Sequence, residues 1–227
     1  MVNLFGKNIK GVIFDLDGTL LDSMWGWDKV DNDFLAENGI ELTPDYTETV
    51  KQMHFKEASL YTKNRYNLSL SPEQIQKRWI EMVEKEYSQD IFLKPFAYEF
   101  IVALLDKGVK VGYATTLFKE MAIPCLLNNK INSESLKRKC PLTTIEEVER
   151  GKGFPDIYLL SAEKMGVSAE ECIVFEDIPL AIEGAKAGGF EFCGVYDKYS
   201  NAHTNFKSLC KNYITNFEEL LEMIKKN

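Results

Sequence analysis

The stretch from Gly11 to Asp22 constrains the fold of this chain more than any other. Residues 12–14 form a short apolar run, and Asp15 and Asp17 follow it at once. An apolar run bounded by glycine is typical of a buried strand. Burying an unpaired charge is costly, so two carboxylates at the end of such a strand need an explanation. Either the strand ends in a polar Asp-Gly turn, or the carboxylates belong to a site of metal-assisted phosphoryl transfer.

The order of apolar segments predicts an α/β fold with a doubly wound parallel sheet. Further strands are expected at 110–114, 172–175, 190–196 and 213–214. Helical patterns alternate with them over 100–105, 117–127, 157–165, 179–187 and 216–224. Strands that alternate with helices form parallel sheets with helices on both faces.

The segment after the first strand is expected to be an all-helical insert. Apolar residues recur at helical spacing from Trp27, and Gly39 ends that pattern. A second helix is expected from Pro44 towards Arg65, and Ser71 followed by Pro and Gln74 predicts the start of a third. No strand is expected between residues 23 and 93. We therefore predict two domains, an α/β core of residues 1–21 and 95–227 and a helical domain of residues 22–94.

Polar residues follow three of the predicted strands. Asp15 and Asp17 follow the first, residues 115–116 (Thr-Thr) another, and residues 176–177 (Glu-Asp) a third. Parallel strands end at the same edge of a sheet, where open α/β sheets bind ligands. The carboxylates would repel one another, and all-oxygen ligands of this kind suit Mg²⁺. Lys152, in a loop before a helix, could bring a positive charge to the same edge.

The composition excludes several classes of function. With 27 basic and 35 acidic residues the net charge is −8, which gives no long-range attraction for nucleic acid or an anionic membrane. The five cysteines contain no CxxC pair, so neither a zinc site nor a disulfide framework is expected. The longest apolar run, residues 100–105, is far shorter than the roughly 20 residues of a membrane-spanning helix. Without a signal-peptide pattern before Asp15, we expect a cytoplasmic protein; its oligomeric state is open.

Four motifs together resemble the haloacid dehalogenase superfamily of aspartate-nucleophile phosphatases. They are Asp15-Leu-Asp-Gly-Thr19, Ala114-Thr-Thr116, Gly151-Lys-Gly-Phe-Pro-Asp156 and Phe175-Glu-Asp177, in the family's order and spacing. The helical insert resembles the cap of the subgroup that contains β-phosphoglucomutase and phosphoglycolate phosphatase. Two departures, Gly153 after the motif lysine and Phe96 after Pro95, concern loop conformation and no reacting group.

The resemblance implies a mechanism in which Asp15 is the nucleophile. Its carboxylate would attack phosphorus and form an aspartyl-phosphate. Asp17 would protonate the leaving oxygen and then deprotonate the water that hydrolyses this intermediate. Because dehalogenases of the superfamily do not need the second aspartate as an acid, Asp17 favours phosphate over halide.

The resemblance also implies how Mg²⁺ and phosphate are bound. The metal would be held by the Asp15 carboxylate, the Asp17 backbone carbonyl and Asp177, with help from Glu176. Phosphate oxygens would be held by the remaining motif residues: Thr115, Thr116, Lys152 and the closely approaching backbone of Gly18.

The predicted substrate is a small phosphorylated metabolite whose identity depends on the cap. Trp25 and Trp27 could line an apolar wall, although packing is an equal explanation. His54 and Lys56 could contact a polar leaving group, but a solvated surface explains them better. A phosphosugar mutase of the β-phosphoglucomutase type is the alternative function, disfavoured because residues 51–56 contain neither glycine nor arginine. A catalytically silent phosphometabolite-binding protein is a further alternative, against which both motif aspartates argue.

Overall fold

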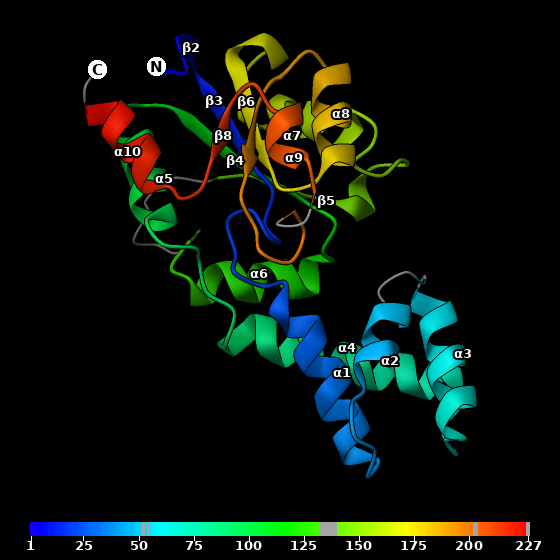
Figure 1. Ribbon diagram of the computed structural model, residues 1–227. Coiled ribbons are helices and arrows are strands. Elements are labelled where there is room, and N and C mark those ends of the chain that lie inside the picture. Colours follow the sequence, from blue (N-terminus) through cyan, green and yellow to red (C-terminus); the bar gives the residue numbers. More distant parts are fainter. Residues whose placement is uncertain (51–52, 54, 132–139, 202–203, 226–227) are drawn as a thin grey trace. The chain divides into compact units, whose positions relative to one another are not determined.

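A six-stranded parallel sheet organises the larger part of the chain (Figure 1). The computed structural model describes residues 1–50, 53, 55–131, 140–201 and 204–225. Within them the strands lie in the order β5 (Leu142–Thr144), β4 (Lys110–Thr115), β3 (Gly11–Phe14), β6 (Cys172–Glu176), β7 (Glu191–Val195) and β8 (Tyr213–Ile214). The first strand of the prediction is thus a central strand, and the predicted α/β class is confirmed.

The register of the central strands decides which residues meet at the carboxyl edge of the sheet. Phe14 lies opposite Tyr113 of β4 and opposite Phe175 of β6. The backbone N–H of Asp15 donates to the Phe175 carbonyl at 3.1 Å, which extends this pairing by one residue. Asp15 and Glu176 therefore leave the sheet at the same level.

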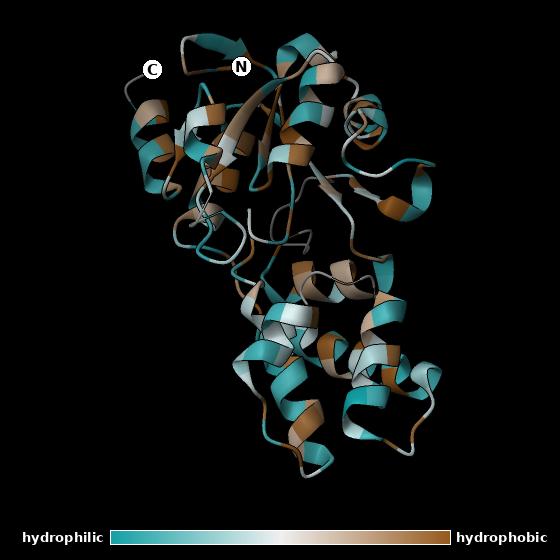
Figure 2. Ribbon diagram, turned by 45° about the vertical axis from the view of Figure 1, so that its right-hand side comes forward, coloured by the Kyte–Doolittle hydropathy of each residue, from teal (hydrophilic) through white to brown (hydrophobic). Residues whose placement is uncertain are grey.

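Helices cover both faces of the sheet. On one face, Ile13 and Val174 pack in a core with Ile157 and Tyr158 of α7 (Asp156–Met165) and Ala185 of α8 (Pro179–Ala187). On the other, the rings of the neighbouring strand residues Phe14 and Phe175 contact those of Phe100, in α5 (Ala97–Asp106), and Phe217, before α10 (Glu218–Lys225). Successive strand side chains point to opposite faces, so both faces of a central strand must be apolar. In Figure 2 these strands carry mainly hydrophobic colours. The remaining helical elements of this unit are α6 (Lys119–Asn128), α9 (Phe206–Leu209), η2 (Ile145–Glu147) and η3 (Ala169–Glu171).

Two features made of strands, a hairpin and an edge strand, were missed by the sequence patterns. The chain begins with an antiparallel hairpin, β1 (Val2–Leu4) and β2 (Lys7–Ile9). Its two-residue turn holds Phe5 and Gly6 at positive φ. This conformation is uncommon for phenylalanine, so the sequence did not indicate the turn. The edge strand β5 is the other, because a three-residue Leu-Thr-Thr segment has no strand pattern of its own and exists by pairing with β4.

Residues 24–90 form a second compact unit, and the secondary-structure elements of its described residues are all helices. Its helices are α1 (Trp25–Glu37), α2 (Pro44–Val50), α3 (Phe55–Tyr66) and α4 (Pro72–Gln89). The predicted start of α4 is confirmed: the Ser71 hydroxyl accepts from the Gln74 N–H, and the Gln74 side chain accepts from the Ser71 N–H. The single helix expected from Pro44 towards Arg65 is wrong. Two helices occupy that span, and a turn bond from the Met53 N–H to the Val50 carbonyl follows the first.

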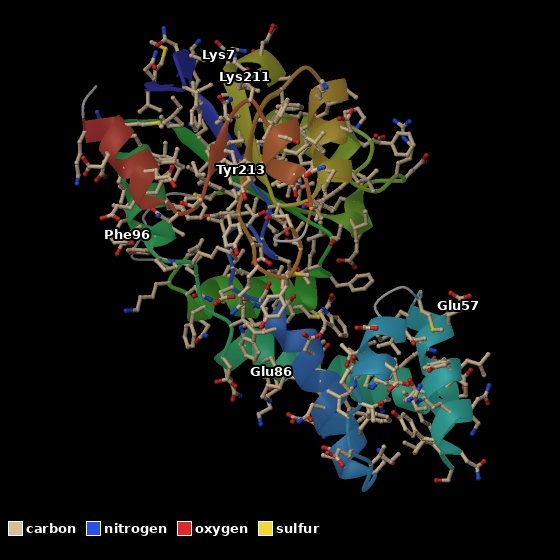
Figure 3. All side chains as sticks on the ribbon, in the orientation of Figure 1. Lys7, Glu57, Glu86, Phe96, Lys211 and Tyr213 are labelled. Atoms are coloured by element: carbon tan, nitrogen blue, oxygen red, sulfur yellow. The ribbon has the colours of Figure 1, made fainter. Side chains whose placement is uncertain are left out.

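The helical unit has its own small core. Phe34 of α1 packs edge-on against Trp79 of α4, with ring centroids 5.7 Å apart. Lys29 of α1 donates at 2.5 Å to Glu86 of α4, which is labelled in Figure 3. Along these helices Figure 2 shows hydrophilic and hydrophobic segments in alternation, as amphipathic packing requires.

The larger unit comprises residues 1–23 and 91–227. The boundaries expected from the sequence were 21/22 and 94/95.

Among the described residues, the helices are all too short or too polar to cross a lipid bilayer.

Candidate active site

Lys152 joins two acidic side chains at the carboxyl ends of neighbouring strands. Its ammonium group donates to Asp15 Oδ1 and, at 2.7 Å, to Glu176 Oε1. All three side chains are buried. The sequence placed Lys152 far from both carboxylates along the chain, and the fold brings them into direct contact.

The loop that carries Lys152 can approach the site because residue 184 is glycine. A Cβ at Gly184 would lie 2.0 Å from the Lys152 carbonyl oxygen and 2.9 Å from that of Phe154. No side chain fits at such distances, so the loop packs directly on the backbone of α8. Gly184 thereby determines how deeply Lys152 is buried.

Asp177 completes a group of three buried carboxylates. Oxygen atoms of Asp15, Glu176 and Asp177 all lie within 4.8 Å of one another. The Thr19 hydroxyl donates to Asp177 Oδ1 at 3.3 Å, and so holds this carboxylate from the loop after β3. Three converging carboxylate oxygens are a donor set that suits a hard divalent cation.

The hydrogen bonding of the two Glu176 carboxylate oxygens also indicates a site for a cation. Oε1 accepts from Lys152 and, at 2.7 Å, from the Tyr158 hydroxyl. Oε2 is buried and has no hydrogen-bond partner within the described residues. A buried carboxylate oxygen without a donor costs free energy unless a cation or water satisfies it. The residues present therefore fit a bound Mg²⁺.

The pKa values of the site reflect an excess of acidic groups. Burial and then the Asp15 carboxylate raise the pKa of Glu176 to about 8, and the same two causes raise the pKa of Asp177 to about 7. Burial alone would lower the pKa of Lys152, but Asp15 and Glu176 raise it above its ordinary value, so the lysine stays cationic. One fixed cation thus faces three carboxyl groups.

These shifts predict how the stability of the metal-free protein depends on pH. A carboxyl group whose pKa is raised by folding binds more protons in the folded state, so the free energy of unfolding falls as pH rises through its titration. With Glu176 and Asp177 as the responsible groups, we expect a loss on the order of 2 kcal/mol between pH 5 and pH 8.5 in EDTA. Thermal unfolding at a series of pH values measures it.

If Mg²⁺ binds the ionised carboxylates, adding it should reverse this trend, because a ligand of the folded state stabilises that state by mass action. The Asp177→Asn variant is the control and should show a flatter pH dependence in EDTA. A metal-free protein whose melting temperature rises steadily from pH 5 to pH 8.5 would contradict the prediction.

Asp17 lies in a tight turn that begins where β3 ends. The Ser23 hydroxyl donates to Asp17 Oδ1 at 2.6 Å. Gly18 has a φ of 72°, in the left-handed region that favours glycine, and the Leu21 N–H closes the turn on the Leu16 carbonyl at 2.8 Å. The polar Asp-Gly turn, the first of the two interpretations offered above for the end of this strand, is therefore present.

Thr115 ends β4, and Thr116 follows it at the surface. The Thr115 hydroxyl is buried and accepts a hydrogen bond from the Leu117 N–H at 3.1 Å. Its own O–H can therefore still donate towards a ligand. Register places the end of β4 next to the end of β3, as predicted for residues that share one edge.

The candidates of the helical unit are less informative. Trp25 is half-buried; Trp27 is exposed and packs edge-on against Phe55 with centroids 6.0 Å apart. Lys56 is exposed. His54 lies outside the described residues.

Several contacts of this site could not be expected from the sequence. Tyr158 lies in a stretch that the family resemblance covered, but no pattern gave it a role. Thr19 is the last residue of the first motif and Ser23 lies shortly after it, but the sequence indicated no role for either residue. Each acts through one hydroxyl whose partner is decided by the fold.

Comparison with known proteins places this geometry in context. The family described as haloacid dehalogenase-like hydrolase matches residues 12–195. Hexitol phosphatase A of Escherichia coli (strain K12) is 29% identical over 182 residues, which cover 79% of this chain and 80% of that protein. The phosphorylated carbohydrates phosphatase of Thermotoga maritima is 25% identical over 184 residues, 81% of this chain and 83% of that protein. The solved structure of CbbY from Rhodobacter sphaeroides in complex with phosphate shares the fold, with a TM-score of 0.74 and 20% identity over 96% of this chain and 99% of that one.

Proposed function

Because the chain belongs to the haloacid dehalogenase-like hydrolases, we propose that it is a Mg²⁺-dependent phosphatase that hydrolyses a small phosphorylated metabolite. The observation that carries the proposal is the buried contact of Lys152 with Asp15 and Glu176, beside a third carboxylate. A buried anionic nucleophile next to a fixed cation is suited to attack on an anionic phosphate.

Asp15 forms the covalent bond of the first step. One of its carboxylate oxygens attacks phosphorus, and the bond between phosphorus and the leaving oxygen breaks as the new bond forms. Asp17 gives its proton to the leaving oxygen, which departs as an alcohol. Ser23 orients Asp17 through the 2.6 Å hydrogen bond to its Oδ1.

A water molecule completes the reaction. Asp17, now ionised, takes a proton from this water as the water attacks phosphorus of the aspartyl-phosphate. The phosphorus–Asp15 bond breaks, inorganic phosphate leaves, and both aspartates return to their initial states. One carboxyl group can act as acid and then as base because the two steps alternate.

Lys152 and Thr115 bind the non-bridging phosphate oxygens. The Lys152 ammonium is held in place before the substrate arrives, so little reorganisation is needed when charge shifts in the transition state. The Thr115 O–H and the backbone around Gly18 and Thr116 add donors at the same edge.

The ligands proposed for Mg²⁺ are Asp15, Asp177, the Asp17 backbone carbonyl and, in support, Glu176. When bound, the metal neutralises the repulsion between the carboxylate nucleophile and the phosphate. Glu176 Oε2 and the mutual proximity of the three carboxylates support this assignment.

The substrate class is proposed to be phosphorylated sugars or sugar alcohols. Two relatives whose names state such substrates align over about four fifths of this chain. A screen of phosphorylated hexoses, pentoses and hexitols, against phosphoglycolate and nucleotides, with phosphate release measured in Mg²⁺ and in EDTA, tests the proposal. Release from at least one ester that requires Mg²⁺ is the expected result.

The same screen separates the alternatives. A mutase would transfer phosphate between positions of one sugar without steady release of inorganic phosphate, which ³¹P NMR detects. A silent binding protein would bind phosphate esters in Mg²⁺ without turning any of them over. Either result would replace the phosphatase assignment.

A further inference from the structure

Lys94 occupies a position that no motif indicates, yet its ammonium group has three oxygen partners. It donates to the Gly18 carbonyl and, at 2.7 Å, to the Tyr196 carbonyl, and it forms an ion pair with the Asp197 carboxylate at 3.1 Å. Its side chain is 14% exposed and that of Asp197 only 2%. A largely buried cation with three oxygen partners has a fixed position.

Lys94 holds the turn that carries Asp17 at two points. Its side chain binds the carbonyl of Gly18, the residue after Asp17, and its backbone N–H donates to the Leu20 carbonyl at 2.7 Å. Phe96, labelled in Figure 3, follows two residues later with a φ of 64° and is the N-cap of α5. Lys94 is thus held between the catalytic turn and a helix of the same unit.

Asp197 extends the contact towards Asp177. Its Oδ1 accepts the backbone N–H groups of Tyr199 and Ser200, at 2.8 and 3.0 Å, and its own N–H donates to Asn201 Oδ1 at 3.1 Å. These bonds shape the loop that follows β7.

Asn201 makes the last connection. Its amide donates to the Asp177 carbonyl at 2.9 Å and to the Val195 carbonyl at 2.8 Å, and its Oδ1 also accepts from the Tyr213 hydroxyl at 3.5 Å. The Thr19 hydroxyl then bonds the Asp177 side chain. The hydrogen bonds and the Lys94–Asp197 ion pair therefore form a closed ring from the turn of Asp17, through Lys94, Asp197 and Asn201, to Asp177 and back.

We propose that Lys94 is a positioning residue that, through this ring, fixes the Asp17 turn and Asp177 relative to each other. The inference rests on the function proposed above for Asp17 and Asp177. In this role Lys94 contacts neither the substrate nor the metal. It determines where the backbone of the Asp17 turn and the carboxylate of Asp177 lie. Residues that orient metal ligands in this way change metal affinity as well as rate.

The test compares Lys94→Met with Lys164→Met. Lys164 is the matched control, because its ammonium group also bridges a carbonyl, Leu142 at 2.9 Å, and a carboxylate, Glu147 at 2.6 Å, but at the start of β5. Isothermal titration of MgCl₂ into metal-free protein, without substrate, gives the affinity. Lys94→Met should weaken Mg²⁺ binding and lower kcat by about 10- to 100-fold, with a smaller change in KM. Lys164→Met should match the wild type in both.

Asp197→Asn provides a second, milder variant in case Lys94→Met does not fold. It should lower Mg²⁺ affinity and kcat in the same direction. The double variant should lose little more than Lys94→Met alone, because both residues act in one ring. If Lys94→Met and Asp197→Asn bind Mg²⁺ and turn over like Lys164→Met, the inference is overturned.

Failure of the proposed function is recognised separately. A wild-type protein that binds Mg²⁺ but hydrolyses no phosphate ester contradicts the phosphatase assignment, and the Mg²⁺ titrations then decide on Lys94 by themselves. An active wild type with unaffected Lys94 and Asp197 variants contradicts only the positioning role.

Discussion

Replacing Asp15 with asparagine is expected to reduce turnover by at least about 10⁴-fold, because an amide cannot act as the nucleophile. Asparagine has the same shape as aspartate, so the backbone of the turn and its place beside β6 should persist. The change also removes the charge that raises the pKa values of Glu176 and Asp177. Folding should therefore be retained while the chemical step is lost. Steady-state phosphate release with the best ester of the screen measures the effect.

A trapping experiment connects this loss to covalent chemistry. Wild-type protein quenched in acid during turnover of a ³²P-labelled ester should retain label on the chain, and Asp15→Asn should retain none. Asp22→Asn is the control, since Asp22 belongs to the same loop but is exposed and has no proposed role in the reaction. It should keep both turnover and label. Full turnover by Asp15→Asn would refute the mechanism as proposed.

Replacing Lys152 with methionine should damage stability and activity together. Methionine fills a similar volume but leaves Asp15 and Glu176 buried without their cation. Breaking a buried ion pair from one side costs about 3–5 kcal/mol. The loss should be larger at pH 8 than at pH 5, because at low pH the carboxyl groups can be neutralised by protonation. Denaturant unfolding in EDTA at the two pH values measures it.

The activity of Lys152→Met should fall by at least about 10³-fold, since the group that stabilises charge on phosphate is absent. A paired variant separates the two effects. Lys152→Met with Glu176→Gln removes a positive and a negative charge together, so it should recover part of the stability and none of the activity. Recovery of activity in the double variant, or wild-type stability in the single one, would show that Lys152 does not have the role given to it here.

The family and the position of the candidate site at the sheet edge were predictable from the sequence because they depend on local patterns. An apolar run followed by Asp15 and Asp17 predicts a strand and its end wherever the chain places them. Together with the ends of two other strands, it predicted one acidic edge, and the family match confirms the resemblance on which the proposed roles rest. The start of α4 was equally predictable, since the side chains of Ser71 and Gln74 each accept a hydrogen bond from the backbone N–H of the other within a single turn.

Elements that have no sequence pattern of their own, and that depend on partners elsewhere in the chain, could not be predicted. The β5 strand consists of three residues, two of them threonine, and gains its conformation from pairing with β4. Lys94 and Asn201 look like ordinary polar residues of loops in the sequence. Only the fold shows that their donors meet carbonyls of Gly18, Tyr196, Asp177 and Val195.

The sequence by itself determined which strand ends carry acidic and hydroxyl groups, because side-chain period and strand direction are properties of short segments. The tertiary structure decided how those groups are charged and held. Burial of Lys152 depends on a loop packed against the bare backbone of Gly184. The raised pKa values of Glu176 and Asp177 depend on their own burial and on the neighbouring Asp15 carboxylate. Desolvation and hydrogen-bond partners are set by neighbours distant in sequence, so no local pattern contains them.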